Sequence, residues 1–376
     1  MTSIGIDIGT SNTVVAKVDA NGNITVHKFE DDDLLPSMIH VEETGGNITV
    51  GKAAREFWSG SEDNPGETFR RWKMSMADNI VLATQDWGGG PVDISPERLT
   101  TWLVEHIMKQ ITGGLGGESV DSVVVTVPHG WRREHAEKCL ATRKAAREAE
   151  ADGRPLGATV RDQTVDEPVA AAVYALYAAG NTADFAGKDL LIVDIGGGST
   201  EIAVISLGGI VCNNSIRVAG DDLTADIQEY MSRQHNVRIS ERMAERIKLH
   251  VGSALTDLGS DAPEDYVVHG PNRITALPME VPVCYQEVAH SLDKTVAKIE
   301  NAVLSALENT PPELYADIVK NGIYLSGGGA LLRGIDRRLT EKINIKFHIA
   351  EDPLHSVAKG AGIALKNVER FSFLMR

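Results

Sequence analysis

The chain has 376 residues, more than the roughly 100–200 residues of one typical domain, so we expect two lobes. Hydrophobic residues make up 42%, but no apolar run approaches the roughly 18–20 positions that span a bilayer, and no basic segment precedes an apolar core at the N-terminus, so we expect a cytoplasmic protein. The net charge of -16 argues against sequence-independent binding to nucleic acid, which requires clustered Lys and Arg.

The first elements expected along the chain are two short strands, residues 3–8 and 13–18, joined by the polar turn GTSN. Residues 30–119 are mixed in pattern and end in a helix that Ser95 caps, with Pro96 in its first turn. This opening predicts a β-hairpin whose turn backbone is free to bind a ligand.

Strands and helices then alternate along the rest of the chain. The apolar run at 122–128 predicts a buried strand, and a charged helix is expected over roughly 132–150. A second buried strand at 189–194 leads through IGGGST into another strand, and two helices are expected within 222–255. A long helix over roughly 286–309 follows, and the whole order favours an α/β fold.

An internal repeat is the most informative feature, because DIGTSNT at residues 7–13 returns as DIGGGST at residues 194–200. Glycine and small hydroxyl residues in tight turns let backbone N–H groups approach phosphate oxygens closely. We therefore expect the turns to bind the β- and γ-phosphates of a nucleotide. The residues expected to do so are Gly9, Thr10, Ser11 and Asn12 in the first turn and Gly196, Gly197, Gly198, Ser199 and Thr200 in the second.

Two aspartates, Asp7 and Asp194, directly precede these turns. Because Mg²⁺ keeps much of its hydration shell, carboxylates here could hold its waters without touching the metal. The alternative is that each is a turn carboxylate satisfied by local amides. Two matched copies favour the metal role.

Glu167 begins a predicted helix in VDEPVAAA, where it could orient or deprotonate a water molecule, or merely face the helix dipole.

A third glycine turn, residues 327–329, precedes a helix and could receive adenosine, with Ala330 and Leu331 against the base. This turn consists of Gly327, Gly328 and Gly329. The motifs GxxxxGK[ST], GxGxxG and GxSxG do not occur, which excludes the P-loop, the dinucleotide fingerprint and the hydrolase elbow.

The ordered set DIGTSNT, TVP, VDEPVAAA, DIGGGSTE and LSGGGALLRG resembles the nucleotide-site motifs of the actin, sugar-kinase and heat-shock-chaperone superfamily. The second half, over about 185–368, resembles the bacterial actin family MreB nearly continuously. The first half looks more like the nucleotide-binding domain of DnaK-type chaperones, and RRWKMSM places Lys73 at the position of their phosphate-facing lysine.

The resemblance implies roles for individual residues. Glu167 would position the attacking water, Lys73 would face the phosphates, and Glu245 and Lys248 from ERMAERIK would contact the ribose or adenine. Leu249 departs from the chaperone pattern and agrees with MreB. For Lys73 an ordinary solvent-facing lysine stays an open alternative.

The resemblance also implies an actin-like ATPase fold, with two lobes that each hold a duplicated ribonuclease-H-like mixed sheet flanked by helices. Lobe I is expected at residues 1–160 and 355–376, with subdomain IB at about 30–118. Lobe II is expected at 161–354, with subdomain IIB at about 220–285 and the nucleotide cleft between the lobes.

The expected function is that of an ATP-hydrolysing cytoskeletal protein that binds ATP and Mg²⁺ and polymerises with itself into filaments. Membrane-associated or scaffold proteins are further candidate partners, and direct binding to nucleic acid is not expected. The alternatives are a non-polymerising, DnaK-like ATPase that acts on a protein partner and, less favoured, a sugar-kinase-like phosphotransferase.

Contact with the inner face of the membrane stays open in this interpretation. The tail RFSFLMR carries Phe371, Phe373, Leu374 and Met375, which could insert into a membrane surface or pack back on their own lobe. Packing is the preferred alternative.

Overall fold

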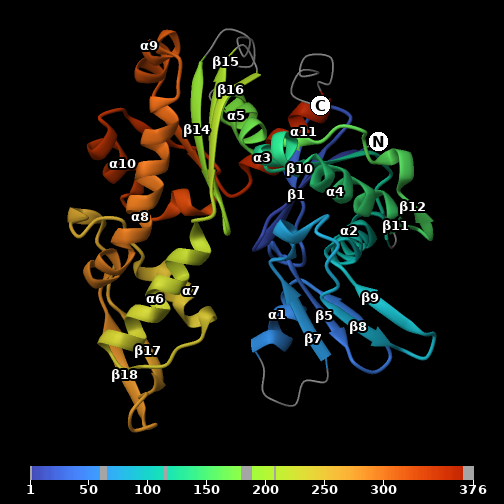
Figure 1. Cartoon of the computed structure of the whole chain (residues 1–376), viewed down its shortest axis with the longest axis horizontal. Coiled ribbons are helices and arrows are strands. Elements are labelled where there is room, and N and C mark those ends of the chain that lie inside the picture. Colours follow the sequence, from blue (N-terminus) through green and yellow to red (C-terminus); the bar gives the residue numbers. More distant parts are fainter. Residues whose placement is uncertain (1, 60–65, 114–116, 179–188, 207–208, 367–376) are drawn as a thin grey trace. The chain divides into compact units, whose positions relative to one another are not determined.

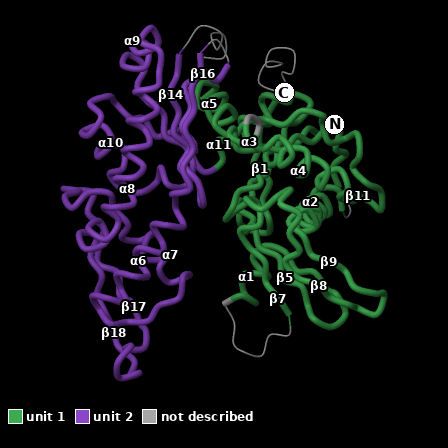
Figure 2. Tube along the Cα trace, in the orientation of Figure 1, with its two compact units in different colours: residues 1–186, 355–376 green, residues 187–354 purple. Residues whose placement is uncertain are grey.

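The computed structural model describes residues 2–59, 66–113, 117–178, 189–206 and 209–366 (Figure 1). They form two compact units, residues 1–186 with 355–376 (unit 1) and residues 187–354 (unit 2) (Figure 2). Unit 2 is thus an insertion in unit 1, and the chain passes between the units twice. The apolar tail residues expected to pack or insert lie outside the described residues.

The main sheet of unit 1 has the strand order β13-β10-β1-β2-β3, and β4 also pairs with β2. β1 runs antiparallel to β2 and parallel to β10, which is itself parallel to β13. The strands are β1 (Thr2–Ile8), β2 (Asn12–Val18), β3 (Ile24–Val26), β4 (Leu35–Pro36), β10 (Val120–Val127) and β13 (Val165–Asp166). The expected strands at 3–8, 13–18 and 122–128 are confirmed to within a few residues.

Smaller strands of unit 1 form a three-stranded sheet and two hairpins. The sheet has the order β6-β5-β7, with β5 at Met38–Glu42, β6 at Ile48–Val50 and β7 at Gly66–Arg70. The hairpins are β8 (Ala83–Asp86) with β9 (Pro91–Ile94) and β11 (Glu150–Ala151) with β12 (Arg154–Pro155).

Three helices of unit 1, α2 (Pro96–Thr112), α3 (His129–Glu134) and α4 (Ala136–Glu148), contribute to its main apolar core, and α11 (Ser356–Lys366) contributes to a smaller cluster against β2. Unit 1 also contains α1 (Lys52–Ser59) and α5 (Glu167–Ala178), with the 3-10 turns η1 (Trp72–Ser75) and η2 (Gly157–Thr159). Leu99, Leu103 and Ile107 of α2 are fully buried, as their helical spacing requires. Ser95 caps α2 by accepting a hydrogen bond from the Arg98 amide, which confirms the predicted start.

The single helix expected over roughly 132–150 is wrong. The chain forms α3 and α4 instead, and His135 between them has φ −143° and ψ 51°, outside the helical region. No Gly or Pro stands at this break, so a local signal for it is missing from the sequence.

The main sheet of unit 2 repeats the pattern of unit 1, with the strand order β16-β15-β14-β19-β20. Its central strand β14 is antiparallel to β15 and parallel to β19, as β1 is to β2 and β10. The strands are β14 (Leu190–Ile195), β15 (Thr200–Ser206), β16 (Gly209–Ile216), β19 (Ile323–Ser326) and β20 (Phe347–Ile349). The expected duplication of the sheet is therefore present.

The remaining elements of unit 2 enclose a second core, in which α8 buries one long apolar face. They are α6 (Gly220–Gln234), α7 (Glu241–Val251), η4 (Gly259–Asp261), β17 (Tyr266–Pro271), β18 (Pro278–Val283), α8 (Tyr285–Glu308), α9 (Pro312–Asn321), η5 (Gly328–Leu331) and α10 (Ile335–Ile343). The two helices expected within 222–255 and the long helix near 286–309 are confirmed.

The division between the units differs from the expected lobe boundary after residue 160. β13 pairs with β10, and α5 packs on α11, so both elements belong to unit 1. Among the described residues, no helix is both long enough and apolar enough to cross a membrane.

Candidate active site

The first glycine turn, residues 9–12, joins β1 to β2 in unit 1. A Cβ on Gly9 would lie 2.2 Å from the Asn12 carbonyl oxygen, so only glycine fits this turn. The Ser37 hydroxyl donates to the Gly9 carbonyl at 2.7 Å, and the Arg55 guanidinium donates to the Asn12 side chain at 3.3 Å. The turn is therefore held in shape before any ligand binds.

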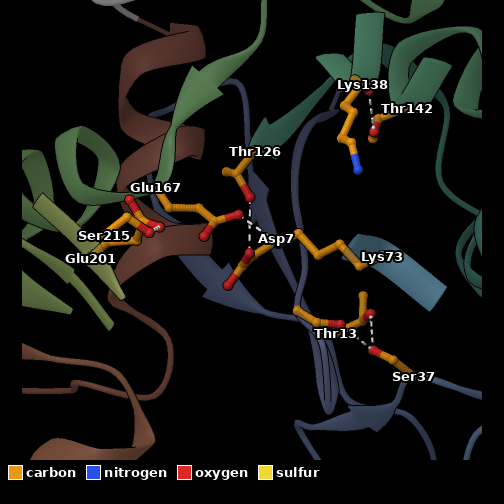
Figure 3. A network of polar contacts seen from close by, with 11 residues as sticks. Asp7, Thr13, Ser37, Lys73, Thr126, Lys138, Thr142, Glu167, Glu201 and Ser215 are labelled. Atoms are coloured by element: carbon orange, nitrogen blue, oxygen red, sulfur yellow. Dashed lines mark hydrogen bonds and ion pairs between the residues drawn. The ribbon is translucent and has the colours of Figure 1, made fainter. Parts of the chain in front are cut away.

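Asp7 lies at the end of β1, beside the neighbouring strand β10. Thr126 Oγ1 donates to Asp7 Oδ1 at 2.9 Å, because the parallel register pairs Ile6 with Val125 (Figure 3). Desolvation raises the pKa of Asp7, while the charge of Lys73 and the bond from Thr126 act in the opposite direction. Thr126 lies in the TVP motif, but sequence reasoning gave it no role of its own.

Lys73 and Glu167 meet in the interior of unit 1, although 94 positions separate them. Lys73 Nζ lies 2.6 Å from Glu167 Oε1, and both side chains are buried (Figure 3). Lys73 is carried by η1, and Glu167 is the first residue of α5. A buried ammonium requires a partner of opposite charge, and the alternative of a solvent-facing lysine does not fit this position.

A second buried pair borders Glu167. His129 Nδ1 lies 2.7 Å from Asp166 Oδ2, and neither side chain is more than 13% exposed. His129 directly follows the TVP motif and Asp166 directly precedes Glu167, so the pair ties the end of β10 to the end of β13. Sequence reasoning missed both residues, and their positions beside two motifs were the available signal.

The second glycine turn, residues 196–200, joins β14 to β15 in unit 2. The Gly196 amide donates to the Ser199 carbonyl at 3.0 Å, which closes the turn. The first amides of α6 donate back to it, Gly220 to the Gly196 carbonyl at 3.1 Å and Asp221 to the Gly197 carbonyl at 2.8 Å. The N-terminus of α6 and the turn thus form one structure.

Glu245 and Lys248 of α7 lie against this same helix start. Lys248 Nζ donates to the Gly220 carbonyl and to Thr224 Oγ1, each at 2.9 Å, and lies 2.7 Å from Glu245 Oε2. Thr224 also donates to Glu245 at 2.6 Å. The two residues that the family resemblance assigned to the nucleoside therefore adjoin the second turn.

The third glycine turn packs against the second. Gly327 has φ +79°, and a Cβ there would lie 2.6 Å from Asp194 Oδ1, so glycine is required on both counts. Ala330 is fully buried, which leaves it no surface to offer to a base, whereas Leu331 is 53% exposed. The expectation that Ala330 faces the base is corrected accordingly.

Each unit therefore gathers its own share of the expected site residues. In unit 1 these are Asp7, Lys73, Glu167 and the turn from Gly9 to Asn12. In unit 2 these are Asp194, the turn from Gly196 to Thr200, Glu245, Lys248 and the third glycine turn. Backbone amides in glycine turns beside carboxyl groups are a combination that can bind phosphate oxygens.

Comparison with known proteins identifies the family. The family model of the MreB/Mbl protein matches residues 93–372, which is more than half of the chain. The cell shape-determining protein Mbl of Bacillus cereus is 42% identical over 371 residues, covering 98% of this chain and 96% of the relative. The chain belongs to the MreB/Mbl family. The likeness to Mbl spans both halves of the chain, including the half that looks DnaK-like in sequence.

Solved structures agree with this assignment. MreB5 of Spiroplasma citri bound to ADP matches with a TM-score of 0.76 and 26% identity, over 98% of this chain and 97% of that one. The same protein has also been solved with AMPPNP. The MamK double helical filament matches with a TM-score of 0.71 at 20% identity, which shows the shared fold. The expected actin-like fold of this MreB/Mbl chain is confirmed.

Proposed function

We propose that this chain is an actin-like cytoskeletal ATPase that binds ATP with Mg²⁺ and polymerises with itself. Membership of the MreB/Mbl family supports the cytoskeletal role. The observation that carries the hydrolytic role is the buried pairing of Lys73 with Glu167 beside Asp7, since these groups come from three separate parts of the chain.

In this proposal the two glycine turns donate backbone N–H groups to the phosphate oxygens, as preorganised groups that need little rearrangement. Glu167 orients the attacking water and accepts its proton, and the ammonium of Lys73 offsets the negative charge that the phosphates bring. Thr126 holds Asp7 in place through its hydrogen bond.

Asp7 and Asp194 are the residues that would hold the hydration shell of Mg²⁺. They fit this role because desolvation raises the pKa of Asp7, so a nearby cation would stabilise its ionised form, and because Asp194 is buried directly beside the third glycine turn. Mg²⁺ would neutralise phosphate charge when it is bound. Glu245, Lys248 and Leu331 would contact the nucleoside.

The nucleotide assignment gains support from MreB5, which has been solved with ADP and with AMPPNP. Filaments of this chain are the proposed product of ATP binding, and scaffold or membrane-associated proteins are proposed further partners in the cytoplasm. A DnaK-like ATPase that does not polymerise is the alternative, favoured by the early resemblance of the first half to such chaperones.

High-speed sedimentation with electron microscopy tests the proposal, with ATP, ADP or a non-hydrolysable analogue in the presence of Mg²⁺. We expect filaments above a critical concentration with ATP, and phosphate release that falls on the order of 100-fold or more in Glu167→Ala, while ATP binding persists.

Glu137→Ala, in the exposed first turn of α4, is the matched control for a mere helix-dipole role. A monomer that still hydrolyses ATP would favour the chaperone-like alternative, and unchanged turnover in Glu167→Ala would remove Glu167 from the reaction.

A further inference from the structure

The segment that carries Lys73 is too short to hold its own shape. η1 is a single 3-10 turn, closed by a hydrogen bond of 3.2 Å from the Met76 amide to the Lys73 carbonyl. Arg71 and Ala77 on either side have φ of 59° and 60°, a region that non-glycine residues rarely adopt. Such backbone persists only where the surroundings fix it.

Two of the anchors of this segment come from α2. Trp72 Nε1 donates to Thr100 Oγ1 at 3.1 Å, and the Ala77 amide donates to Glu97 Oε1 at 2.7 Å. These two contacts fix the two ends of the segment, at Trp72 and Ala77. Neither contact involves Met74, the residue that follows Lys73.

The anchor of the middle is Lys138 of α4, a lysine that the site does not otherwise use. Its ammonium donates to the Met74 carbonyl and pairs with Asp78 Oδ1 at 2.9 Å. The side chain is only 8% exposed, and its ammonium lies 5.9 Å from the Trp131 ring centroid. Burying an ammonium costs desolvation free energy. If the side chain at this position only filled space, an apolar residue would stabilise the turn better.

We infer that Lys138 is a positioning residue for Lys73. It fixes the carbonyl of the residue that follows Lys73 and thereby directs the Lys73 ammonium to Glu167, 2.6 Å away. The inference rests on the proposed ATPase function, and it adds a residue on α4 that acts through η1 and not on the nucleotide itself. An ordinary structural lysine is the alternative, and it predicts a loss of stability without any special dependence on Lys73.

A double-mutant cycle separates the two interpretations. The variants are Lys138→Met, Lys73→Met and their combination, with Lys144→Met as the control, because Lys144 lies on the same helix with 77% of its side chain exposed. We expect Lys138→Met to slow single-turnover phosphate release on the order of 10- to 100-fold with little change in ATP affinity. Because Lys138 acts through Lys73, the double variant should be no slower than Lys73→Met alone. The inference would be overturned if the rate losses of the two single variants multiplied in the double variant. It would also be overturned if Lys138→Met released phosphate at the wild-type rate.

Hydrogen exchange of the nucleotide-free protein gives a second readout that does not depend on turnover. Amides of residues 72–78 should exchange at least about tenfold faster in Lys138→Met and at the wild-type rate in Lys144→Met. Unchanged exchange would show that Lys138 does not hold the turn.

If Lys138→Met does not fold, Asp78→Asn replaces it, since Asp78 is partly exposed and its loss removes one partner of Lys138. Asp78→Asn should change turnover and exchange in the same direction as Lys138→Met, but by less. If Asp78→Asn changes neither, the inference is overturned. A wild-type chain that binds ATP without hydrolysing it would instead overturn the proposed function, while the exchange measurement would still decide whether Lys138 fixes the turn.

Discussion

Asp7 is a residue whose buried carboxyl group affects the stability of the protein without ligand. Desolvation raises its pKa despite the nearby charge of Lys73 and the hydrogen bond from Thr126. A carboxyl group with a raised pKa stabilises the fold while it is protonated, and this contribution is lost as the pH rises through the pKa of the folded state. At neutral pH, Asp7 therefore lowers the stability of the fold when no ligand is bound.

Asp7→Asn should raise the unfolding midpoint of the metal-free and nucleotide-free protein at pH 7, by about 1–4 °C, because the amide has no charge to desolvate. The gain should vanish at acidic pH, where Asp7 itself is protonated. The same variant should lose the stabilisation that Mg²⁺ with ATP gives to the wild type. Differential scanning calorimetry checks this, with Asp121→Asn on the exposed face of β10 as the control. A lowered midpoint at pH 7 would contradict the argument.

Sequence reasoning proposed the residues of the candidate site that stand in motifs, such as Asp7 and Glu167, because turn chemistry marks them locally. It did not find Thr126, His129 or Lys138. Their partners lie between 37 and 119 positions away, so only the pairing of strands and the packing of helices reveals them. A local pattern carries no information about such contacts.

Among the elements, α5 and α11 depend on small residues for their close approach. A Cβ on Gly360 of α11 would lie 1.7 Å from the Ala170 carbonyl oxygen of α5, a distance that backbone atoms cannot accommodate without moving. α11 also lies against β1, where a Cβ on Gly5 would come within 2.8 Å of the Ala358 carbonyl oxygen. The helix therefore fills a narrow space in unit 1.

Gly360→Ala should lower the free energy of unfolding of unit 1 by about 1–3 kcal/mol, because overpacking forces the two helices apart. Gly89→Ala is the control, since a Cβ there meets nothing within 4 Å. Urea unfolding followed by tryptophan fluorescence measures the change. Equal stability of the two variants would show that α5 and α11 can separate at no cost.

Elements with strong periodic or β-branched patterns were predicted well, including both hairpins and α8. The break between α3 and α4 was not, since His135 departs from the helix without any local breaker. β13 was also missed, because a strand of two residues leaves no pattern in the sequence.

On the scale of the whole molecule, the two units differ in the histidines whose pKa values are lowered by burial or partial burial. Burial lowers the pKa of His27, His40 and His106 in unit 1, and of His348 in unit 2. A histidine with a lowered pKa in the folded state binds its proton more readily when unfolded, so stability falls as the pH drops below the ordinary value of 6.5. Through these histidines, a fall in pH should therefore lower the free energy of unfolding of unit 1 more than that of unit 2.

His27→Gln should make unit 1 less sensitive to acid, since the buried Nε2 of His27 has no hydrogen-bond partner and cannot be protonated without cost. Relative to the wild type, its unfolding midpoint should rise as the pH falls from 7 to 5. All 5 tryptophans lie in unit 1, so their fluorescence reports on that unit alone. His290→Gln, exposed in unit 2, is the control. A constant difference between His27→Gln and wild type across this range would contradict the argument.

The return of the chain to unit 1 at residue 355 sets the order in which the protein can mature during synthesis. β1 is made first, but the helix that covers it, α11, leaves the ribosome only after all of unit 2. The inserted unit has every strand of its own sheet earlier, so it can fold while the N-terminal strands still wait for their last partner. In a newly made chain, the face of β1 that α11 covers is therefore without this partner until all of unit 2 has been made.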